Sequence, residues 1–103
     1  MNPRGERNPY KQISSVKVLI EGHVQGVWFR GWTVENARAL DLDGWVQNRR
    51  DGTVQAVFSG TIDKVEEMLR RCNDGPPLAH VTQLKTQPHT LEVQPGFRVK
   101  RSK

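Results

Sequence analysis

The chain has little of several features that would define its class. Cys72 is its single cysteine in 103 residues, so it cannot form an internal disulfide, and we expect a protein of the reducing cytoplasm. No apolar run is long enough to span a bilayer, and residues 1–15 lack the apolar centre of a secretion signal. We therefore expect neither membrane insertion nor secretion, and a chain of this length predicts one domain with an ordinary hydrophobic core.

Acidic residues are also few, because 16 Lys and Arg residues stand against 11 Asp and Glu, which gives a net charge of +5. The excess lies at the two ends. Residues 1–15 and 95–103 together carry +6, and residues 16–94 carry the remaining −1. A nucleic-acid-binding surface normally places basic residues among aromatics on the folded body. We therefore do not expect nucleic acid as a partner, and we attribute the charge to solubility and attraction of anionic substrates.

The apolar pattern predicts where the folded domain begins and how its elements are ordered. Residues 1–15 hold few apolar side chains, which predicts a disordered basic N-terminal arm, and residues 16–103 form the domain. Alternating apolar residues predict strands near 16–21, 45–50, 53–59, 78–87 and 97–101, and helical spacing predicts helices near 30–42 and 61–73. This βαββαβ order with a short final strand is that of the α+β ferredoxin-like sandwich, in which two helices cover one face of an antiparallel sheet.

Short local signals predict the boundaries between these elements. Gly44 is expected to end the first helix, and Thr61 to cap the second. Asp51-Gly52 readily takes the positive φ angles of a tight hairpin turn, so the strands on either side are expected to pair. Cys72 falls on the apolar stripe of the second helix, which predicts a buried structural residue.

The run Gly22–Arg30, Gly-His-Val-Gln-Gly-Val-Trp-Phe-Arg, lies between a β-branched strand and the start of a helix. Its glycines let successive backbone N–H groups turn inward, the helix start adds unpaired donors, and a guanidinium matches phosphate oxygens. Because a cation is unfavourable at a helix N-terminus, Arg30 is expected to face a bound anion. The alternative is an exposed helix arginine with its stem over Trp28 or Trp32.

A second segment, Gly44-Trp-Val-Gln-Asn, ends in an amide side chain. Asparagine is depleted inside strands because its side chain competes for backbone hydrogen bonds, so the presence of Asn48 in a strand needs an explanation. One reason is that the strand frays into the hairpin. The other is that an amide, which both accepts and donates hydrogen bonds, can hold a water in line with a bound phosphorus atom.

Together, Gly22–Arg30 and residues 44–60 resemble the two signature segments of the acylphosphatase family, and the resemblance extends from about Val16 to the C-terminus. It implies a monomeric, metal-independent hydrolase without a cofactor, which cleaves the carboxyl–phosphate bond of acyl phosphates to a carboxylate and inorganic phosphate. Arg30 would hold the phosphate and Asn48 would orient the attacking water. The resemblance also implies a substrate-binding loop whose backbone N–H groups come from Gly22, His23, Val24, Gln25, Gly26 and Val27.

The sparse set of candidate catalytic groups is consistent with that substrate class. The leaving group of an acyl phosphate is a carboxylate whose conjugate acid has a pKa of about 4, so no general acid is needed at neutral pH. The side chain of His23 stays outside the mechanism. His80 and His89 lie far along the chain from His23 without ligand-like spacing, so we expect no metal site.

Two other functions fit the same fold. One is a non-catalytic ferredoxin-like module that binds phosphorylated or nucleic-acid ligands, although the strand at 53–59 offers only Phe58 as an aromatic for base stacking. The other is a role in carbamoyl transfer, in which similar domains act within larger proteins. The short length of this chain argues against the second of these.

Overall fold

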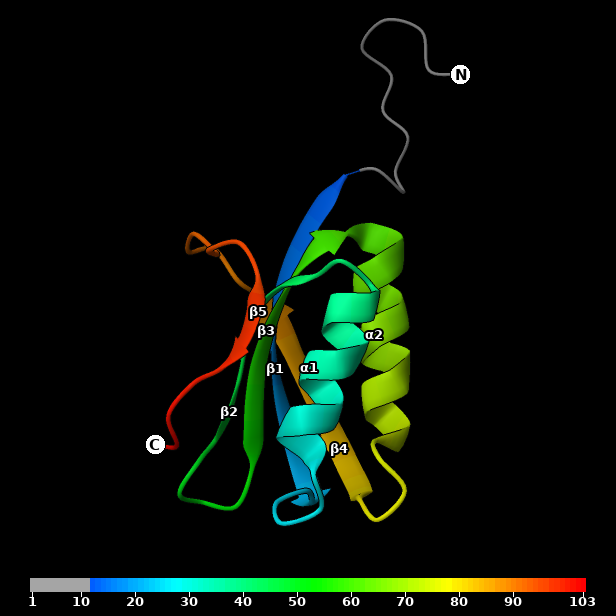
Figure 1. The fold of residues 1–103 in the computed structure, drawn as a ribbon, viewed down its shortest axis with the longest axis vertical. Coiled ribbons are helices and arrows are strands. Elements are labelled where there is room, and N and C mark those ends of the chain that lie inside the picture. The colour runs from blue at the N-terminus through cyan, green and yellow to red at the C-terminus, as the bar shows by residue number, and fades with distance from the viewer. Residues whose placement is uncertain (1–11) are drawn as a thin grey trace, which may run out of the picture.

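The computed structural model describes residues 12–103, and in these residues a five-stranded sheet carries two helices on one face (Figure 1). The elements in chain order are β1 (Ile13–His23), α1 (Phe29–Ala39), β2 (Asp43–Asn48), β3 (Val54–Thr61), α2 (Ile62–Asp74), β4 (His80–Pro88) and β5 (Phe97–Val99). Neither helix combines the length and apolar character needed to cross a bilayer.

The sheet has the strand order β4-β1-β3-β2-β5. β3 lies at its centre between β1 and β2 and is antiparallel to both, and β4 pairs antiparallel with the other edge of β1. β5 lies parallel to β2 at the edge. This topology confirms the predicted α+β ferredoxin-like sandwich, and the parallel edge strand is the one departure from a purely antiparallel sheet.

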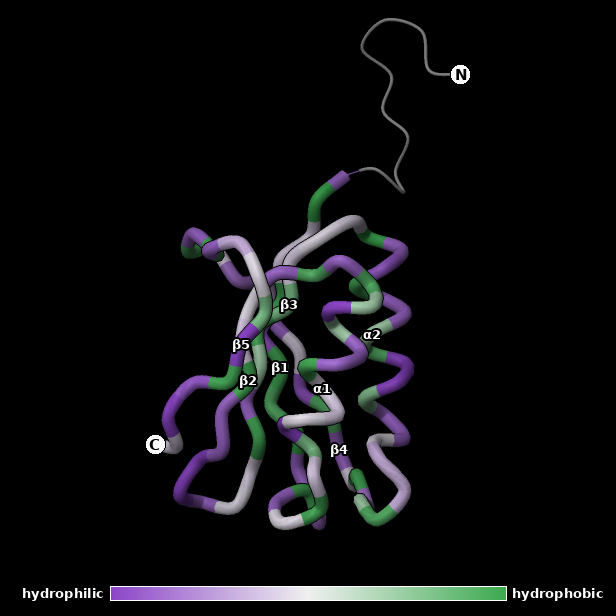
Figure 2. Tube along the Cα trace, viewed as in Figure 1, coloured by the Kyte–Doolittle hydropathy of each residue, from purple (hydrophilic) through white to green (hydrophobic). Residues whose placement is uncertain are grey.

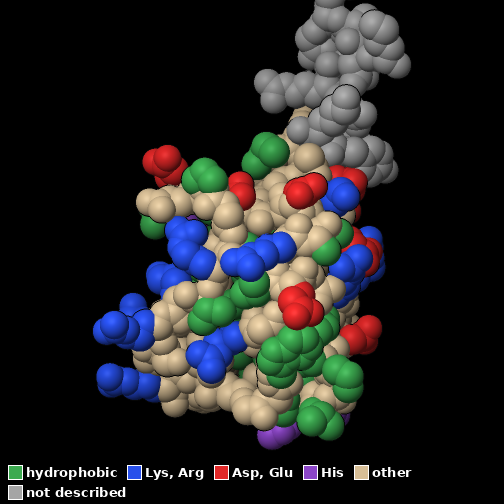
Figure 3. Space-filling view, in the orientation of Figure 1, with side chains coloured by type: hydrophobic (Ala, Val, Ile, Leu, Met, Phe, Trp, Pro, Cys, Tyr) green, Lys and Arg blue, Asp and Glu red, His purple; other side chains and the backbone are tan. Residues whose placement is uncertain are grey.

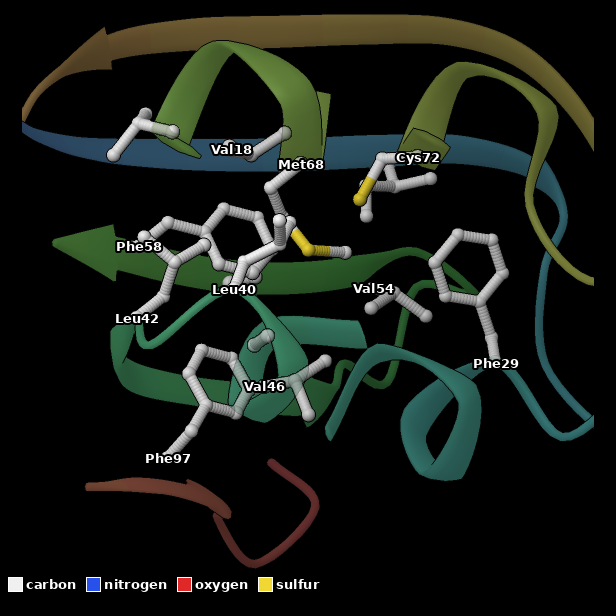
Figure 4. Close-up of a cluster of buried hydrophobic side chains, with 14 of the residues drawn as sticks. Val18, Phe29, Leu40, Leu42, Val46, Val54, Phe58, Met68, Cys72 and Phe97 are labelled. Atoms are coloured by element: carbon white, nitrogen blue, oxygen red, sulfur yellow. The ribbon is translucent and has the colours of Figure 1, made fainter. Parts of the chain in front are cut away.

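The core lies between the sheet and the two helices. Strand residues alternate between the two faces, so Val18 on β1 and Phe58 on β3 point toward the helices and are fully buried. Met68 and Cys72 of α2 belong to the same buried cluster (Figure 4). Figure 2 shows apolar residues along the central strands and polar ones along much of α2. Burial raises the pKa of the Cys72 thiol to about 12, so the predicted structural role of this residue is confirmed.

The first strand begins three residues earlier than predicted. Ile13 pairs with Thr61, and the Ser15 and Ser59 hydroxyls are 2.7 Å apart. Residues 13–15 therefore belong to β1 and not to the arm. Pairing with the long β3 extends the strand through Ser14 and Ser15, whose polar side chains do not favour a strand. Gln12, also predicted to lie in the arm, accepts a hydrogen bond from the Ile62 N–H at 3.0 Å, and residues 1–11 of the predicted arm lie outside the described residues.

The first helix ends at Ala39, so the expectation that it runs to residue 42 and is ended by Gly44 is wrong. Asp41 takes the left-handed conformation with φ 56°. The Leu42 N–H donates to the Ala37 carbonyl at 2.9 Å, and the Asp41 N–H donates to the Arg38 carbonyl at 3.1 Å. These bonds form a Schellman motif, which usually carries glycine at the position that Asp41 occupies.

The hairpin between β2 and β3 also differs from the expected turn, although the predicted pairing of the two strands is confirmed. Gly52 has a positive φ of 91°, but Asp51 does not, and the Gly52 N–H donates to the Arg49 carbonyl at 3.2 Å. Asp51 instead accepts hydrogen bonds from the Thr53 N–H and hydroxyl. At the start of α2, Thr61 is the N-cap residue as predicted, but its side chain makes no capping hydrogen bond.

Candidate active site

The loop between β1 and α1 is anchored at both ends by buried apolar side chains. Val24 is buried where the chain leaves β1, and Phe29 is buried where α1 begins, packed edge-on against Trp32 with ring centroids 5.4 Å apart. Just before the loop, a β-bulge at Gly22 turns the strand; a Cβ on this residue would lie 2.1 Å from the His80 carbonyl oxygen. The path of the loop is therefore held by core packing and by close backbone approach.

The loop leaves its backbone donors free. Gly26 and Trp28 have positive φ angles of 76° and 68°, which turn successive peptide groups. Within residues 12–103, the N–H groups of residues 24–28 donate to no backbone acceptor. α1 follows at once, and its first turn contains no acidic residue. Free N–H groups and an uncompensated helix N-terminus together favour a bound anion.

The Gln25 side chain ties this loop to the β2–β3 hairpin. Its Nε2 donates to the carbonyl oxygens of Arg49 and Thr53, at 2.8 Å in both cases. The Arg49 N–H donates to the same Thr53 carbonyl at 2.9 Å. Because Arg49 directly follows Asn48, this bridge links the loop to the strand end that carries the second candidate catalytic residue.

Arg30 is the second residue of α1, and Phe29 beside it is buried in the core. Among the described residues its guanidinium makes one hydrogen bond, a long one in which Nη1 donates to the Ser102 hydroxyl at 3.5 Å. In the described part of the chain, no carboxylate lies within ion-pair distance of its guanidinium. The charge of Arg30 is therefore available to an anionic ligand.

Asn48 is the last residue of β2. Its carbonyl oxygen accepts a hydrogen bond from the Lys103 N–H at 2.9 Å, so the C-terminal residues continue the sheet edge beyond β5. Its side-chain Oδ1 is buried and has no hydrogen-bond partner among residues 12–103. A buried, unpaired amide oxygen is costly in a folded protein, and such a group calls for a ligand or another explanation.

The two candidate catalytic residues, Arg30 and Asn48, both line one cavity of about 290 Å³. Of the six residues predicted to bind substrate through the loop, Val24, Gln25 and Gly26 line this cavity. The other three do not line it: Gly22 forms the bulge, His23 ends β1 opposite His80, and Val27 is packed in the core.

The family model of the acylphosphatases matches residues 16–99 of this chain. An acylphosphatase of Rhodospirillum rubrum is 52% identical over 90 residues, which cover 87% of this chain and 99% of that protein. The chain belongs to the acylphosphatase family. The predicted family and the predicted enzyme class, a hydrolase, are confirmed.

Solved acylphosphatases share the fold of this family member closely. The structure from Coxiella burnetii is 33% identical and superposes with a TM-score of 0.82, covering 85% of this chain and 93% of that one. The structure from Bacillus subtilis is 28% identical with a TM-score of 0.81, covering 86% and 99%.

Four cavity residues of this acylphosphatase family member were not predicted as site residues: Trp28, Phe29, Gly31 and Val99. Trp28 is 57% exposed, whereas Phe29 is buried in the core and reaches the cavity only in part. Val99 comes from β5, far along the chain. In the sequence Val99 looks like an ordinary strand residue. It reaches the site because β5 pairs in parallel with β2.

The ionisable groups around the cavity are mostly basic. Arg49, Arg50 and Lys103 surround a neighbouring hollow beside the hairpin, with Asp51 as the one acid lining it among the described residues. Hydrogen bonds from the side chain and backbone of Thr53, followed by the charge of Arg49, hold the pKa of the Asp51 carboxyl below its usual value. Among residues 12–103, no group of three or more His, Cys, Asp or Glu side chains is placed to hold a metal ion.

Proposed function

We propose that this chain hydrolyses acyl phosphates to a carboxylate and inorganic phosphate, and that Arg30 and Asn48 are its catalytic residues. The observation that carries the proposal is that both residues line one cavity with Val24, Gln25 and Gly26 of the β1–α1 loop, whose N–H groups donate to no backbone acceptor among the described residues. We also propose that the protein is a monomer and acts in the cytoplasm. The cytoplasmic location is supported by the lone cysteine, which is buried and therefore unsuited to disulfide exchange.

In this mechanism the phosphate group of the substrate occupies the loop. The N–H groups of the loop and the N-terminus of α1 donate to the equatorial oxygens, and the Arg30 guanidinium supplies two parallel donors and a full positive charge. These groups are held in place before the reaction by the buried Val24 and Phe29. They stabilise the charge that develops on the phosphoryl oxygens in the transition state.

Asn48 holds the attacking water. Its side-chain amide holds the water by hydrogen bonding and aims the water oxygen at phosphorus, opposite the carboxylate leaving group. The new P–O bond forms to the water oxygen while the bond from phosphorus to the acyl oxygen breaks, and the electron pair of that bond leaves with the carboxylate. The water proton passes to a phosphate oxygen of the substrate, so neither a phosphoenzyme nor a protein general base is required.

The test is hydrolysis of benzoyl phosphate and acetyl phosphate by the full-length chain in excess EDTA. We expect turnover by the wild type and a loss of kcat on the order of 10² to 10³ in both Arg30→Ala and Asn48→Ala. Circular dichroism should be unchanged in both variants. Arg70→Ala, which removes an exposed arginine of α2 outside the cavity, is the matched control and keeps wild-type rates.

Two results would overturn the proposal. Normal turnover in Arg30→Ala and Asn48→Ala would remove both residues from the mechanism. Binding of inorganic phosphate by the wild type without hydrolysis of either substrate would favour the non-catalytic module that binds phosphorylated ligands.

A further inference from the structure

Trp28 is the largest apolar side chain that the described residues leave exposed at the cavity. Its side chain is 57% exposed, whereas the neighbouring Phe29 is buried and Trp32 packs against Phe29. Single exposed apolar residues are common on protein surfaces and usually need no explanation. Trp28 differs because its exposed surface lines the cavity that also contains Arg30 and Asn48.

Local geometry holds the indole at this place. Trp28 has a φ of 68°, a left-handed conformation that is unusual for a bulky residue and therefore strained. The indole also packs directly over Gly31, where a Cβ would lie 2.2 Å from the Trp28 Nε1. A side chain at position 31 would push the ring away. The strained backbone and the missing side chain together keep one side of the ring packed and leave the rest exposed.

The cavity therefore has two chemically distinct parts. The loop N–H groups, Arg30 and Asn48 form a polar part suited to the phosphate, which every acyl phosphate carries. Trp28 and Val99, which is 46% exposed, add apolar surface to the same cavity. The phosphate and the reacting water bind to the polar groups. The apolar surface is therefore available to the remaining portion of the substrate, the acyl group.

We propose that Trp28, with Val99, forms a subsite for the acyl group and makes this enzyme prefer acyl phosphates whose acyl group is planar and apolar, such as an aromatic ring. Offset stacking on an indole suits a flat ring, while an acetyl group is too small to use that surface. The inference rests on the proposed function, because it names the substrate class of the same site.

The experiment compares kcat/KM for benzoyl phosphate with kcat/KM for acetyl phosphate in the full-length chain. In Trp28→Asn, which keeps a residue tolerant of positive φ but removes the ring, we expect the benzoyl-to-acetyl ratio to fall about tenfold, as the loss of a stacking contact predicts. In Trp28→Phe, which keeps an aromatic face, the ratio should stay within about twofold of the wild type. Val99→Thr, nearly identical in shape, should lower the ratio without touching the loop.

Inhibition by inorganic phosphate separates the subsite from a disturbed loop, because phosphate probes only the polar part. An unchanged benzoyl-to-acetyl ratio in Trp28→Asn would overturn the inference. So would an equal loss for both substrates with weakened phosphate inhibition, since Trp28 would then act only on the loop. If the wild type hydrolyses neither substrate, the proposed function itself fails, and that outcome is visible before any variant is compared.

Discussion

Arg30 carries the full positive charge of the proposed phosphate site, and the shape of its charged group matters as much as its sign. A guanidinium presents parallel N–H donors that match two phosphate oxygens, whereas an ammonium is a point charge. The buried Phe29 directly before it fixes where the side chain leaves α1. Substitution at this position should therefore separate charge from geometry.

We expect Arg30→Lys to keep the fold and the charge but to lose the paired donors. Inhibition by inorganic phosphate should weaken about tenfold, and kcat should fall by about 10² because the same donors stabilise the transition state. Steady-state kinetics with phosphate as a competitive inhibitor measures both effects, with Arg70→Lys on α2 as the control. A phosphate inhibition constant equal to the wild-type value would show that the loop N–H groups bind phosphate without the help of Arg30.

The two proposed catalytic residues were predictable because each breaks a local preference. Arg30 lies at the helix end that disfavours a cation, and Asn48 is an amide within a strand. Each position is locally unfavourable, which indicates from the sequence alone that a ligand or a function compensates the cost. Trp28 breaks no such rule, and an aromatic residue near a helix start usually packs in the core. Only its left-handed backbone, which follows from the loop conformation, places it at the cavity.

At the scale of elements, the site depends on how the β1–α1 loop and the β2–β3 hairpin are held together. The Gln25 amide bridges them through the Arg49 and Thr53 carbonyls. The resemblance to the family assigned Gln25 to substrate binding through its backbone, so the bridge by its side chain adds a second role. The bridge links the proposed phosphate-binding loop to the strand end that carries Asn48.

Gln25→Met replaces the amide by an apolar side chain of similar length and leaves two carbonyls without that donor. We expect the free energy of unfolding to fall by about 1–3 kcal/mol and kcat to fall about tenfold, with a smaller change in KM. Urea unfolding and steady-state kinetics measure these effects. In a double-mutant cycle, Gln25→Met should cost little more once Asn48→Ala is present, because the bridge acts by positioning Asn48. Fully multiplicative losses in kcat would contradict this role.

The elements themselves were largely predictable, and their ends were not. Apolar periodicity reports burial, which extends over whole strands and helices, whereas an end depends on single backbone conformations. The end of α1 is an example, because Asp41 adopts a conformation that glycine usually supplies. The start of β1 is another, because pairing with β3 determines it and the side chains of residues 13–15 do not.

The surface of α2 provides a pH-dependent contribution to stability. Glu67 accepts hydrogen bonds from Arg70 at 2.7 Å and from Arg71 at 2.9 Å, and Arg71 also donates to Asn36 of α1 at 2.8 Å. The bond from Arg70, and then that from Arg71, lowers the pKa of the Glu67 carboxyl below its usual value. Because the pKa is lower in the folded state, the ionised carboxylate stabilises the fold above its unfolded pKa, and this contribution disappears as the pH falls through the folded pKa.

Glu67→Gln should therefore unfold at a lower urea concentration than the wild type at about pH 7, and at nearly the same concentration at about pH 2. Glu66→Gln is the matched control. The i, i+4 spacing would pair Glu66 with Arg70, but in the structure Arg70 pairs with Glu67. A difference between wild type and Glu67→Gln that stays constant across this pH range would show that the effect is not electrostatic.

At the scale of the whole molecule, positive charge is distributed unevenly around the proposed active site. Figure 3 shows Lys and Arg side chains gathered over β5, the C-terminal residues and the β2–β3 hairpin. The exposed members of this basic edge are Arg50, Arg98, Lys100, Arg101 and Lys103. The C-terminal residues are held there by hydrogen bonds to β2, including the one from the Gln47 side chain to the Arg101 carbonyl at 2.8 Å.

Such an edge should draw anionic substrates toward the cavity without taking part in the reaction. We expect Arg101→Glu to lower kcat/KM for acetyl phosphate at low ionic strength while leaving kcat near the wild-type value, because steering acts on encounter and not on the bound complex. Salt screens this effect over about 10 Å at 0.1 M, so the difference between variant and wild type should shrink as salt is added. Lys64→Glu on α2 makes the same change in net charge away from the cavity and should have little effect. Equal losses in the two variants would show that net charge matters and its placement does not; a loss that persists at high salt would show that Arg101 contacts the substrate directly.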